Sequence, residues 1–262
     1  LLYLLSVFNE YFKSFSVQCN GVDSHVNQKA YAAICQESNC MLCLEYKTYF
    51  AIFRSSYNRI FRCDNGTVTH QDRSGRCWLF SSLNVARFVA KQNMGLKEFE
   101  FSQNYAMYYD KLERVNYFLK DVAKLVPADS RLMQHLLSDV MGDGGPETIA
   151  MNVYKKYGAV PKDLFPETES SKNTGEMNVQ LRRMLHTAVA HMYADPSAID
   201  AIIADAVAAG HRILTIHLGE PPKSFDWEWT DKDGEFHRDG EITPVEFWKK
   251  YVGSADLESY VC

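Results

Sequence analysis

One short stretch of the chain carries the residue types of a cysteine nucleophile, Gln71-Asp-Arg-Ser-Gly-Arg-Cys-Trp78. Apolar residues follow Cys77 at helical spacing, so its thiol lies at the predicted N-terminus of a helix, where free N–H groups and the helix dipole favour the thiolate. Gln71 can return across the turn at Gly75 and offer its side-chain amide to an oxyanion, beside the N–H of Cys77. Trp78 can cover the site. This arrangement predicts attack by the Cys77 thiolate on a carbonyl carbon.

A lone cysteine at the start of a helix is more often a buried structural residue than a nucleophile. Here the Gln-x5-Cys-Trp spacing with an intervening Gly favours the nucleophile. The papain-like signature has a small residue and a second Cys at this turn, where this chain has Arg76 and Ser74. The missing Cys removes a disulfide, which favours a cytosolic enzyme over a secreted one.

The segment from Gln71 to Arg87 resembles the bleomycin hydrolase/aminopeptidase C family of papain-like cysteine peptidases. The likeness covers about residues 64–262, and residues 1–60 show no resemblance to that family. The further matching motifs are Glu98-Phe-Glu-Phe-Ser-Gln-Asn-Tyr105, Tyr109-Asp-Lys-Leu-Glu-Arg114, Tyr117-Phe-Leu119, Asp143-Gly-Gly145, Lys156-Tyr-Gly-Ala-Val-Pro161, Phe165-Pro-Glu-Thr168, Leu218-Gly-Glu-Pro-Pro222, Trp227-Glu228, Asp231-Lys-Asp233 and Ile242-Thr-Pro244.

The resemblance implies roles for particular residues. It implies that Cys77 is the nucleophile and Gln71 the oxyanion-hole residue. The residues that it places along the substrate are Gly75, Trp78 and the loop of Asp143, Gly144 and Gly145. Family members have Gln and a bulky aromatic residue after these glycines, where this chain has Pro146 and Glu147, so we expect different substrate contacts there.

The implied fold is papain-like and α+β, with a helical half facing a β-barrel half. Inserted helices and hairpins build a ring-shaped hexamer in this family. Its members are intracellular aminopeptidases that act on peptide substrates and need no metal, so we expect a cytoplasmic homo-oligomer without a cofactor.

A cysteine peptidase also needs a base for the thiol, normally a His that an Asn or Asp orients. His211 follows Cys77 at about the right distance. It lies in a segment that is typical of a helix rather than of the strand that presents this base, and no Asn occurs after Asn178. The resemblance places the His and Asn motifs in the β-barrel half, beyond Cys262. We therefore expect the helical half with the β-barrel half largely missing, and an inactive or nearly inactive chain.

Two parts are predicted along the chain. Residues 1–63 have weak periodicity and an unclear origin, and residues 64–262 form the nucleophile-bearing part. Both ends, at Leu1 and Cys262, indicate a trimmed fragment. The predicted helices begin at Cys77, after a cap at Ser102, at Glu147, at Asp195-Pro196 with a weak point at Gly210, and after a capping box at Thr243-Pro-Val-Glu246. The helix from Glu147 is predicted to end at Tyr157, where Gly158 and Pro161 close it. A hairpin is predicted from Phe225 to His237, with its turn at Asp231-Lys-Asp-Gly234.

The composition argues against two classes of partner. The formal net charge is −5, whereas a protein whose main partner is nucleic acid needs a basic face. No apolar run reaches the roughly 18 residues that span a bilayer, so we expect no membrane partner. Seven cysteines, an odd number, favour reduced intracellular thiols.

Two other functions stay open. Cys35, Cys40, Cys43 and Cys63 have the spacing of a plant-type [2Fe–2S] ferredoxin and could also hold zinc through four thiolates. The chain could instead be a non-catalytic relative that serves as an assembly or binding module through the aromatic residues between Tyr105 and Phe118, although that spacing is also typical of a helix core.

Overall fold

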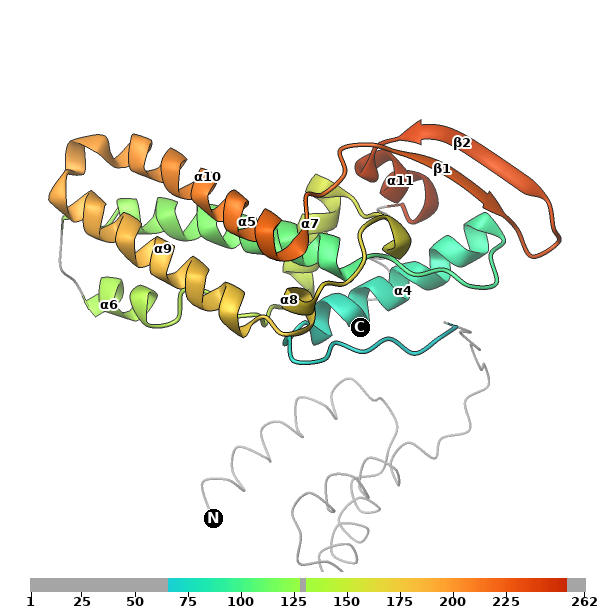
Figure 1. Ribbon diagram of the computed structural model, residues 1–262, viewed down its shortest axis with the longest axis horizontal. Coiled ribbons are helices and arrows are strands. Elements are labelled where there is room, and N and C mark those ends of the chain that lie inside the picture. The colour runs from blue at the N-terminus through green and yellow to red at the C-terminus, as the bar shows by residue number, and fades with distance from the viewer. Residues whose placement is uncertain (1–65, 128–130, 254–262) are drawn as a thin grey trace, which may run out of the picture. The chain divides into compact units, whose positions relative to one another are not determined.

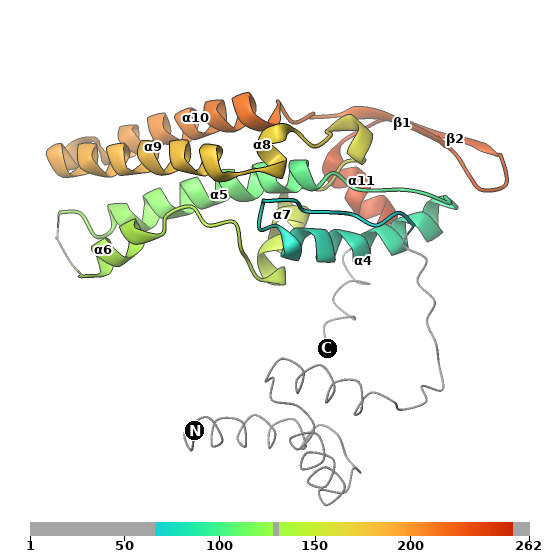
Figure 2. The ribbon, with the colours of Figure 1, turned by 60° about the horizontal axis from the view of Figure 1, so that its bottom comes forward.

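The structure of the protein is a computed structural model that describes residues 66–127 and 131–253, all of which belong to one compact unit, Cys63–Cys262. Four long helices form the framework of this part. They are α4 (Cys77–Met94), α5 (Gln103–Ala123), α9 (Gly175–Ala194) and α10 (Ile199–Leu218). Helices α5, α9 and α10 contact one another and run side by side, whereas α4 lies below the hairpin (Figures 1 and 2).

The remaining elements are short. The α-helices are α6 (Arg131–Ser138), α7 (Glu147–Tyr157), α8 (Glu169–Lys172) and α11 (Pro244–Tyr251), and the 3-10 helices are η1 (Lys162–Leu164) and η2 (Pro196–Ala198). Strands β1 (Phe225–Thr230) and β2 (Phe236–Ile242) pair antiparallel, with an irregularity between Trp227 and Glu228. The described residues are thus mainly helical with one two-stranded sheet, which confirms the predicted α+β class.

Local signals in the sequence explain where these helices begin and end. Ser102 accepts a hydrogen bond from the N–H of Tyr105 and caps α5, as predicted. Thr243 and Glu246 form the predicted capping box of α11. The end of α7 at Gly158, where φ is +72°, is also as predicted.

The hairpin is attached to the helices by aromatic side chains. The rings of Phe99, Trp227 and Phe247 lie with centroids 5.2–6.2 Å apart, in edge-to-face or tilted pairs. The indole N–H of Trp229 donates to the carbonyl of Met94 at the end of α4. Each aromatic ring pair contributes about 1 kcal/mol beyond the burial of its area, so the ring pairs and this hydrogen bond anchor the hairpin to the helices.

Helix α10 continues through Gly210, which the sequence identified as a weak point. A methyl group on Gly210 would lie 3.3 Å from Cε of Met184 in α9 and 3.3 Å from Cγ1 of Val115 in α5. The glycine is therefore the point where α10 approaches its two neighbours, and this packing offsets its low helix propensity. Helix α9 itself was not predicted.

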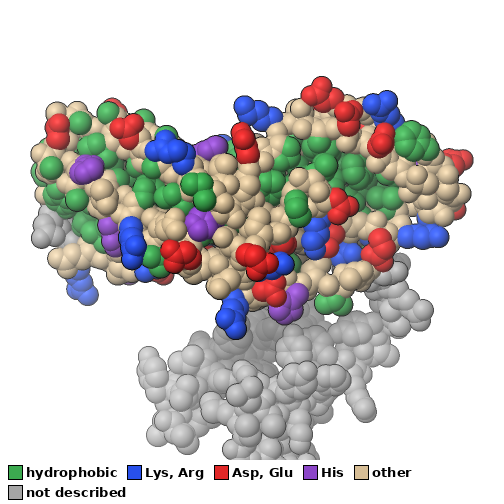
Figure 3. Space-filling view, viewed as in Figure 1, with side chains coloured by type: hydrophobic (Ala, Val, Ile, Leu, Met, Phe, Trp, Pro, Cys, Tyr) green, Lys and Arg blue, Asp and Glu red, His purple; other side chains and the backbone are tan. Residues whose placement is uncertain are grey.

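The surface is mixed in charge. On the face shown in Figure 3, acidic and basic side chains are interspersed over the helices and the hairpin, without the basic stripe that tracks a nucleic-acid backbone. No helix within the described residues combines the length and the apolar character that a bilayer crossing requires.

Candidate active site around Cys77

Cys77 is the first residue of α4, and its thiol is exposed and unpaired. The preceding residue, Arg76, makes no side-chain cap on the helix, so no side chain satisfies the N–H groups of the first turn. Uncapped N–H groups and the positive end of the helix dipole both stabilise an anion. The predicted position of the thiol at a helix N-terminus is confirmed.

The turn before Cys77 is closed by side chains of its own residues. Gly75 and Asp72 have positive φ angles of +57° and +52°, which reverse the chain direction within a few residues. The Ser74 hydroxyl donates to the carbonyl oxygen of Gln71 at 2.5 Å. Gln71 is half-buried, and its Oε1 atom is buried without a hydrogen-bond partner.

The loop of Asp143, Gly144 and Gly145 lies against this turn. A methyl group on Gly75 would lie 3.0 Å from Cβ of Asp143, and one on Gly145 would lie 3.1 Å from Cε2 of Trp78. Both distances are tighter than nine in ten real Cβ contacts, so a side chain at either position would require its neighbour to shift. The structure therefore brings the loop against Gly75 and Trp78, the neighbours of Cys77, although the loop is more than 60 positions away from them in the sequence.

Trp78 is buried and points inward. Its indole N–H donates to the carbonyl oxygen of Asp143 at 2.8 Å, and the guanidinium of Arg114 lies 5.9 Å from its ring centroid. Trp78 thus connects the start of α4 to the loop of Asp143.

The carboxylate of Asp143 accepts hydrogen bonds from three side chains of the protein. It accepts hydrogen bonds from Lys111 Nζ at 2.6 Å, from the Thr174 hydroxyl at 2.6 Å and from Asn178 Nδ2 at 2.9 Å. Burial alone would raise the pKa of Asp143, but these three donors outweigh it and hold the pKa below its ordinary value. Lys111 is 1% exposed, and burial lowers the pKa of its ammonium while Asp143 opposes that shift.

A second ion pair, in which Asp110 is buried and Arg114 is half-buried, supports the glycines. Arg114 Nη2 donates to the carbonyl oxygen of Gly144 at 2.8 Å, and its Nε donates to the Asp110 carboxylate. Burial raises the pKa of Asp110, and Arg114 opposes this. Asp110, Lys111 and Arg114 lie within the motif Tyr109–Arg114, for which the sequence alone indicated no role. Their i, i+3 and i, i+4 spacing was the signal that they share one face of α5.

Within residues 66–127 and 131–253, no hydrogen bond joins a histidine to the Cys77 thiol. His211 lies in α10 and is exposed, as expected for a helical position. His70 Nδ1 is 2.8 Å from Asp72 Oδ1 in the same turn as Gln71, but this pair is exposed.

One group of potential metal ligands occurs in the described residues, Asp231, Glu235 and His237 at the turn of the hairpin. The Asp231 carboxylate already accepts hydrogen bonds from the N–H groups of Asp233 and Glu235, and its other oxygen lies 2.9 Å from His237 Nε2. These bonds close the turn and account for the cluster. The predicted Cys35, Cys40, Cys43 and Cys63 cluster lies outside the described residues.

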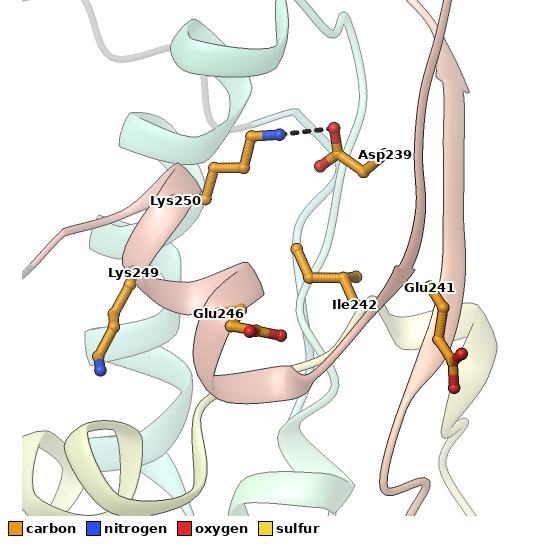
Figure 4. Close-up of a pocket in the computed structure, with 6 residues that line it drawn as sticks. All are labelled: Asp239, Glu241, Ile242, Glu246, Lys249 and Lys250. Carbon is orange, nitrogen blue, oxygen red and sulfur yellow. Dashed lines mark hydrogen bonds and ion pairs between the residues drawn. The ribbon is translucent and has the colours of Figure 1, made fainter.

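A hollow lies between β2 and α11 (Figure 4), and several of the polar side chains around it bond to one another. Lys250 Nζ lies 2.6 Å from Asp239 Oδ1, and the Tyr251 hydroxyl donates to Oδ2 of the same carboxylate. The residues around the hollow include none from the turn of Cys77 or from the Asp143 loop, so it is separate from the candidate site.

Comparison with known proteins assigns the chain to a family. The sequence profile of the Peptidase C1-like family matches residues 10–262, nearly the whole chain. This chain belongs to the Peptidase C1-like family. The match also extends to residues 10–63, where the motifs alone showed no resemblance.

Relatives within the Peptidase C1-like family support the predicted subgroup. The chain is 40% identical over 206 residues to an aminopeptidase C of Lactobacillus delbrueckii subsp. lactis, a match that covers 76% of this chain and 46% of the relative. It is 38% identical over 211 residues to a bleomycin hydrolase of Oryctolagus cuniculus, covering 74% of each sequence. The chain spans about half the length of most of these relatives.

A solved structure agrees with the fold. The crystal structure of PepW from Lactobacillus rhamnosus HN001 superposes with a TM-score of 0.70 and 32% sequence identity, over 90% of this chain and 57% of that one. The predicted resemblance to the bleomycin hydrolase/aminopeptidase C family is thereby confirmed, and with it a papain-like α+β fold represented mainly by helices.

Proposed function

We propose that this chain is the nucleophile-bearing part of a cysteine aminopeptidase. The Cys77 thiolate attacks the carbonyl carbon of a peptide bond, the amine leaves, and water then hydrolyses the thioester. Gln71 and the N–H of Cys77 hold the oxyanion, and the backbone of Asp143, Gly144 and Gly145 runs beside the substrate. Some relatives are named aminopeptidases, and in this proposal the enzyme likewise removes residues from the N-termini of peptides.

The observation that carries this proposal is the placement of Cys77. An exposed, unpaired thiol begins a long helix whose first N–H groups lack a side-chain cap, and a glycine-rich loop is packed against the turn before it. Such a thiol has the charge stabilisation and the access that a nucleophile needs. The identity to named aminopeptidases and hydrolases supports the reaction class.

The charged groups around the loop have a supporting role in this mechanism. The carbonyl oxygens of Gly142, Asp143 and Gly144 accept hydrogen bonds from Lys111, Trp78 and Arg114, respectively. Three consecutive carbonyls are therefore held by side chains of α4 and α5. A loop fixed in this way offers its remaining backbone groups to a peptide without a further ordering cost.

We also propose that the 262 residues alone have little peptidase activity. A thiol attack of this kind needs a base that returns the proton to the leaving amine, and no described histidine is bonded to Cys77. In the proposed enzyme this base is a His from the β-barrel half that the resemblance implies. A Cys77-dependent activity of the isolated 262 residues comparable with that of a relative would contradict this part.

The experiment is a substrate assay on the complete gene product with Cys77→Ala, and with Cys63→Ser as a control thiol change. An aminoacyl aminomethylcoumarin amide tests the reaction, and its N-acetylated form tests for the free N-terminus. We expect Cys77→Ala to lower kcat/KM by about a thousandfold or more, Cys63→Ser to leave it unchanged, and the acetylated substrate to be resistant. Equal activity of wild type and Cys77→Ala would overturn the assignment.

Assembly and location follow the same proposal. The family resemblance implies a ring-shaped hexamer in the cytoplasm, and sedimentation of the complete gene product tests the oligomer directly. The alternative of an aromatic assembly surface has less support, because Tyr105, Tyr108 and Phe118 are buried in the core. Within that stretch Tyr117 is the aromatic residue with high exposure, at 70%.

A further inference from the structure

The residue directly before the nucleophile is a buried arginine. Arg76 is 1% exposed, which is unusual because a guanidinium in the interior loses its hydration and must find partners for its N–H groups. A small residue at this position would build the same turn without that cost. The arginine therefore calls for an explanation beyond the formation of the turn.

Each nitrogen of the Arg76 guanidinium has a partner. Nε donates to the Ser74 hydroxyl at 2.7 Å, Nη1 donates to Glu167 Oε1 at 3.0 Å, and Nη2 donates to Glu167 Oε2 at 2.8 Å. The guanidinium also lies 5.1 Å from the ring centroid of Phe80, one turn into α4. Two parallel bonds to one carboxylate fix both the position and the orientation of the planar group.

These bonds continue to the residue proposed to hold the oxyanion. The Ser74 hydroxyl that accepts from Arg76 donates in turn to the carbonyl oxygen of Gln71 at 2.5 Å. One chain of hydrogen bonds thus crosses the turn from the residue adjoining Cys77 to Gln71. The two groups that must act on the same carbonyl are tied to one guanidinium.

The far end of this chain is also anchored. Glu167 Oε2 accepts from the Ser171 hydroxyl at 2.5 Å, and Thr168 and Ser171 form a capping box around the start of α8. The N–H of Arg73 donates to the carbonyl of Lys172 at the end of the same helix. The turn is therefore attached to α8 by a side-chain path and by a backbone bond.

We propose that Arg76 is a positioning residue that, through Ser74 and Glu167, fixes the separation of Gln71 from Cys77. The inference rests on the proposed function. A group that is misplaced by about 1 Å can cost roughly a hundredfold in rate, so a device that holds this distance would be reflected in catalysis and not only in stability.

The test compares two reagents on the complete gene product. An aminoacyl fluoromethyl ketone reacts with Cys77 through a tetrahedral adduct whose oxyanion needs Gln71, whereas iodoacetamide alkylates a thiolate by direct displacement and forms no oxyanion. The ratio of the two second-order rate constants reports the alignment of Gln71 with Cys77. Loss of thiolate lowers both rates and leaves the ratio unchanged, and both rates are measured at Cys77 under conditions in which each variant is shown by circular dichroism to be folded.

The variants are Arg76→Met, Arg76→Lys and Ser74→Ala, with Arg87→Met as the matched control. Arg87 is 2% exposed and lies within α4, where it bonds to Glu98 and to the carbonyl of Thr67 away from the turn. We expect Arg76→Met to lower the ratio by about tenfold or more, Ser74→Ala to lower it by less, and Arg87→Met to leave it unchanged. Arg76→Lys keeps the charge without the fork, so its ratio should stay low.

Three outcomes separate the proposals. An unchanged ratio in folded Ser74→Ala and Arg76→Lys, with only a lower Tm, would make Arg76 a purely structural residue and overturn this inference. A ratio lowered equally in Arg87→Met would overturn it as well. If wild-type Cys77 reacts with neither reagent faster than a thiol of the denatured protein, the proposed function fails instead.

Discussion

Replacing Asp143 by Asn removes the anion that faces a buried ammonium. Lys111 is 1% exposed, and its ammonium would keep only neutral acceptors, the carbonyl oxygen of Gly142 at 2.9 Å and the amide oxygen of the new side chain. Breaking a buried ion pair on one side costs about 3–5 kcal/mol. The Asp143 side chain is 19% exposed, so we expect the lower end of that range, about 3 kcal/mol of unfolding free energy.

The assay is urea unfolding of wild type and Asp143→Asn at neutral pH, with Asp139→Asn as the control. Asp139 lies four positions earlier and is exposed, so its replacement should stay within about 0.5 kcal/mol of wild type. In a unit of this size, a loss of about 3 kcal/mol corresponds to a fall in Tm of roughly 6–12 °C. The double variant Lys111→Met with Asp143→Asn should recover part of the loss, because no charge then remains buried.

The pH dependence gives a second check on the same pair. The pKa of Asp143 is lower in the folded chain than its ordinary value. Its charge therefore stabilises the fold at pH values above the unfolded pKa of about 4, and this contribution is lost as the pH falls through the folded pKa. The difference between wild type and Asp143→Asn should shrink below about pH 4. A difference under about 1 kcal/mol at neutral pH, or one that does not change with acid, would refute the ion pair as described.

Two further predictions concern the junction of α7 with α11 and the start of α11. Gly158→Ala should destabilise the protein by at least about 3 kcal/mol, because at a φ of +72° its methyl group would lie 2.1 Å from the carbonyl oxygen of Pro244. The control, Gly234→Ala, also has a positive φ, +88°, but no atom lies within 4 Å of the added methyl group, so it should cost only about 1 kcal/mol. Comparable Tm values for the two would contradict the close approach. Thr243→Ala removes the hydroxyl that bonds the N–H of Glu246 and should cost about 1 kcal/mol in urea unfolding; a loss below measurement error would mean that α11 does not depend on its cap.

The elements with local signals could be predicted from the sequence. Caps at Ser102 and Thr243, the stop at Gly158 and the turn at Asp231 act within a few residues, so each signal is present in the sequence that it shapes. Helix α9 begins at Gly175 without a side-chain cap, and its start is therefore not marked in the same way. Its buried Met177, Leu181 and Leu185, spaced by four, were the available signal.

The site divides in the same way. The sequence by itself determined that Cys77 begins a helix after a tight glycine turn, and its family resemblance implied that the motif of Asp143, Gly144 and Gly145 lies beside the same substrate. Those features follow from short-range backbone preferences and from motifs. They could be named without any coordinates.

The tertiary structure alone decided what holds these parts together. Arg76 meets Glu167, which lies 91 positions away, and Asp143 meets Lys111, Thr174 and Asn178, which come from elements on both sides of it in the chain. A charged side chain shows no local preference for one distant partner over another. The partner is chosen by the packing of α4, α5, α8 and α9, because burial makes every unpaired charge costly and only these neighbours are within reach.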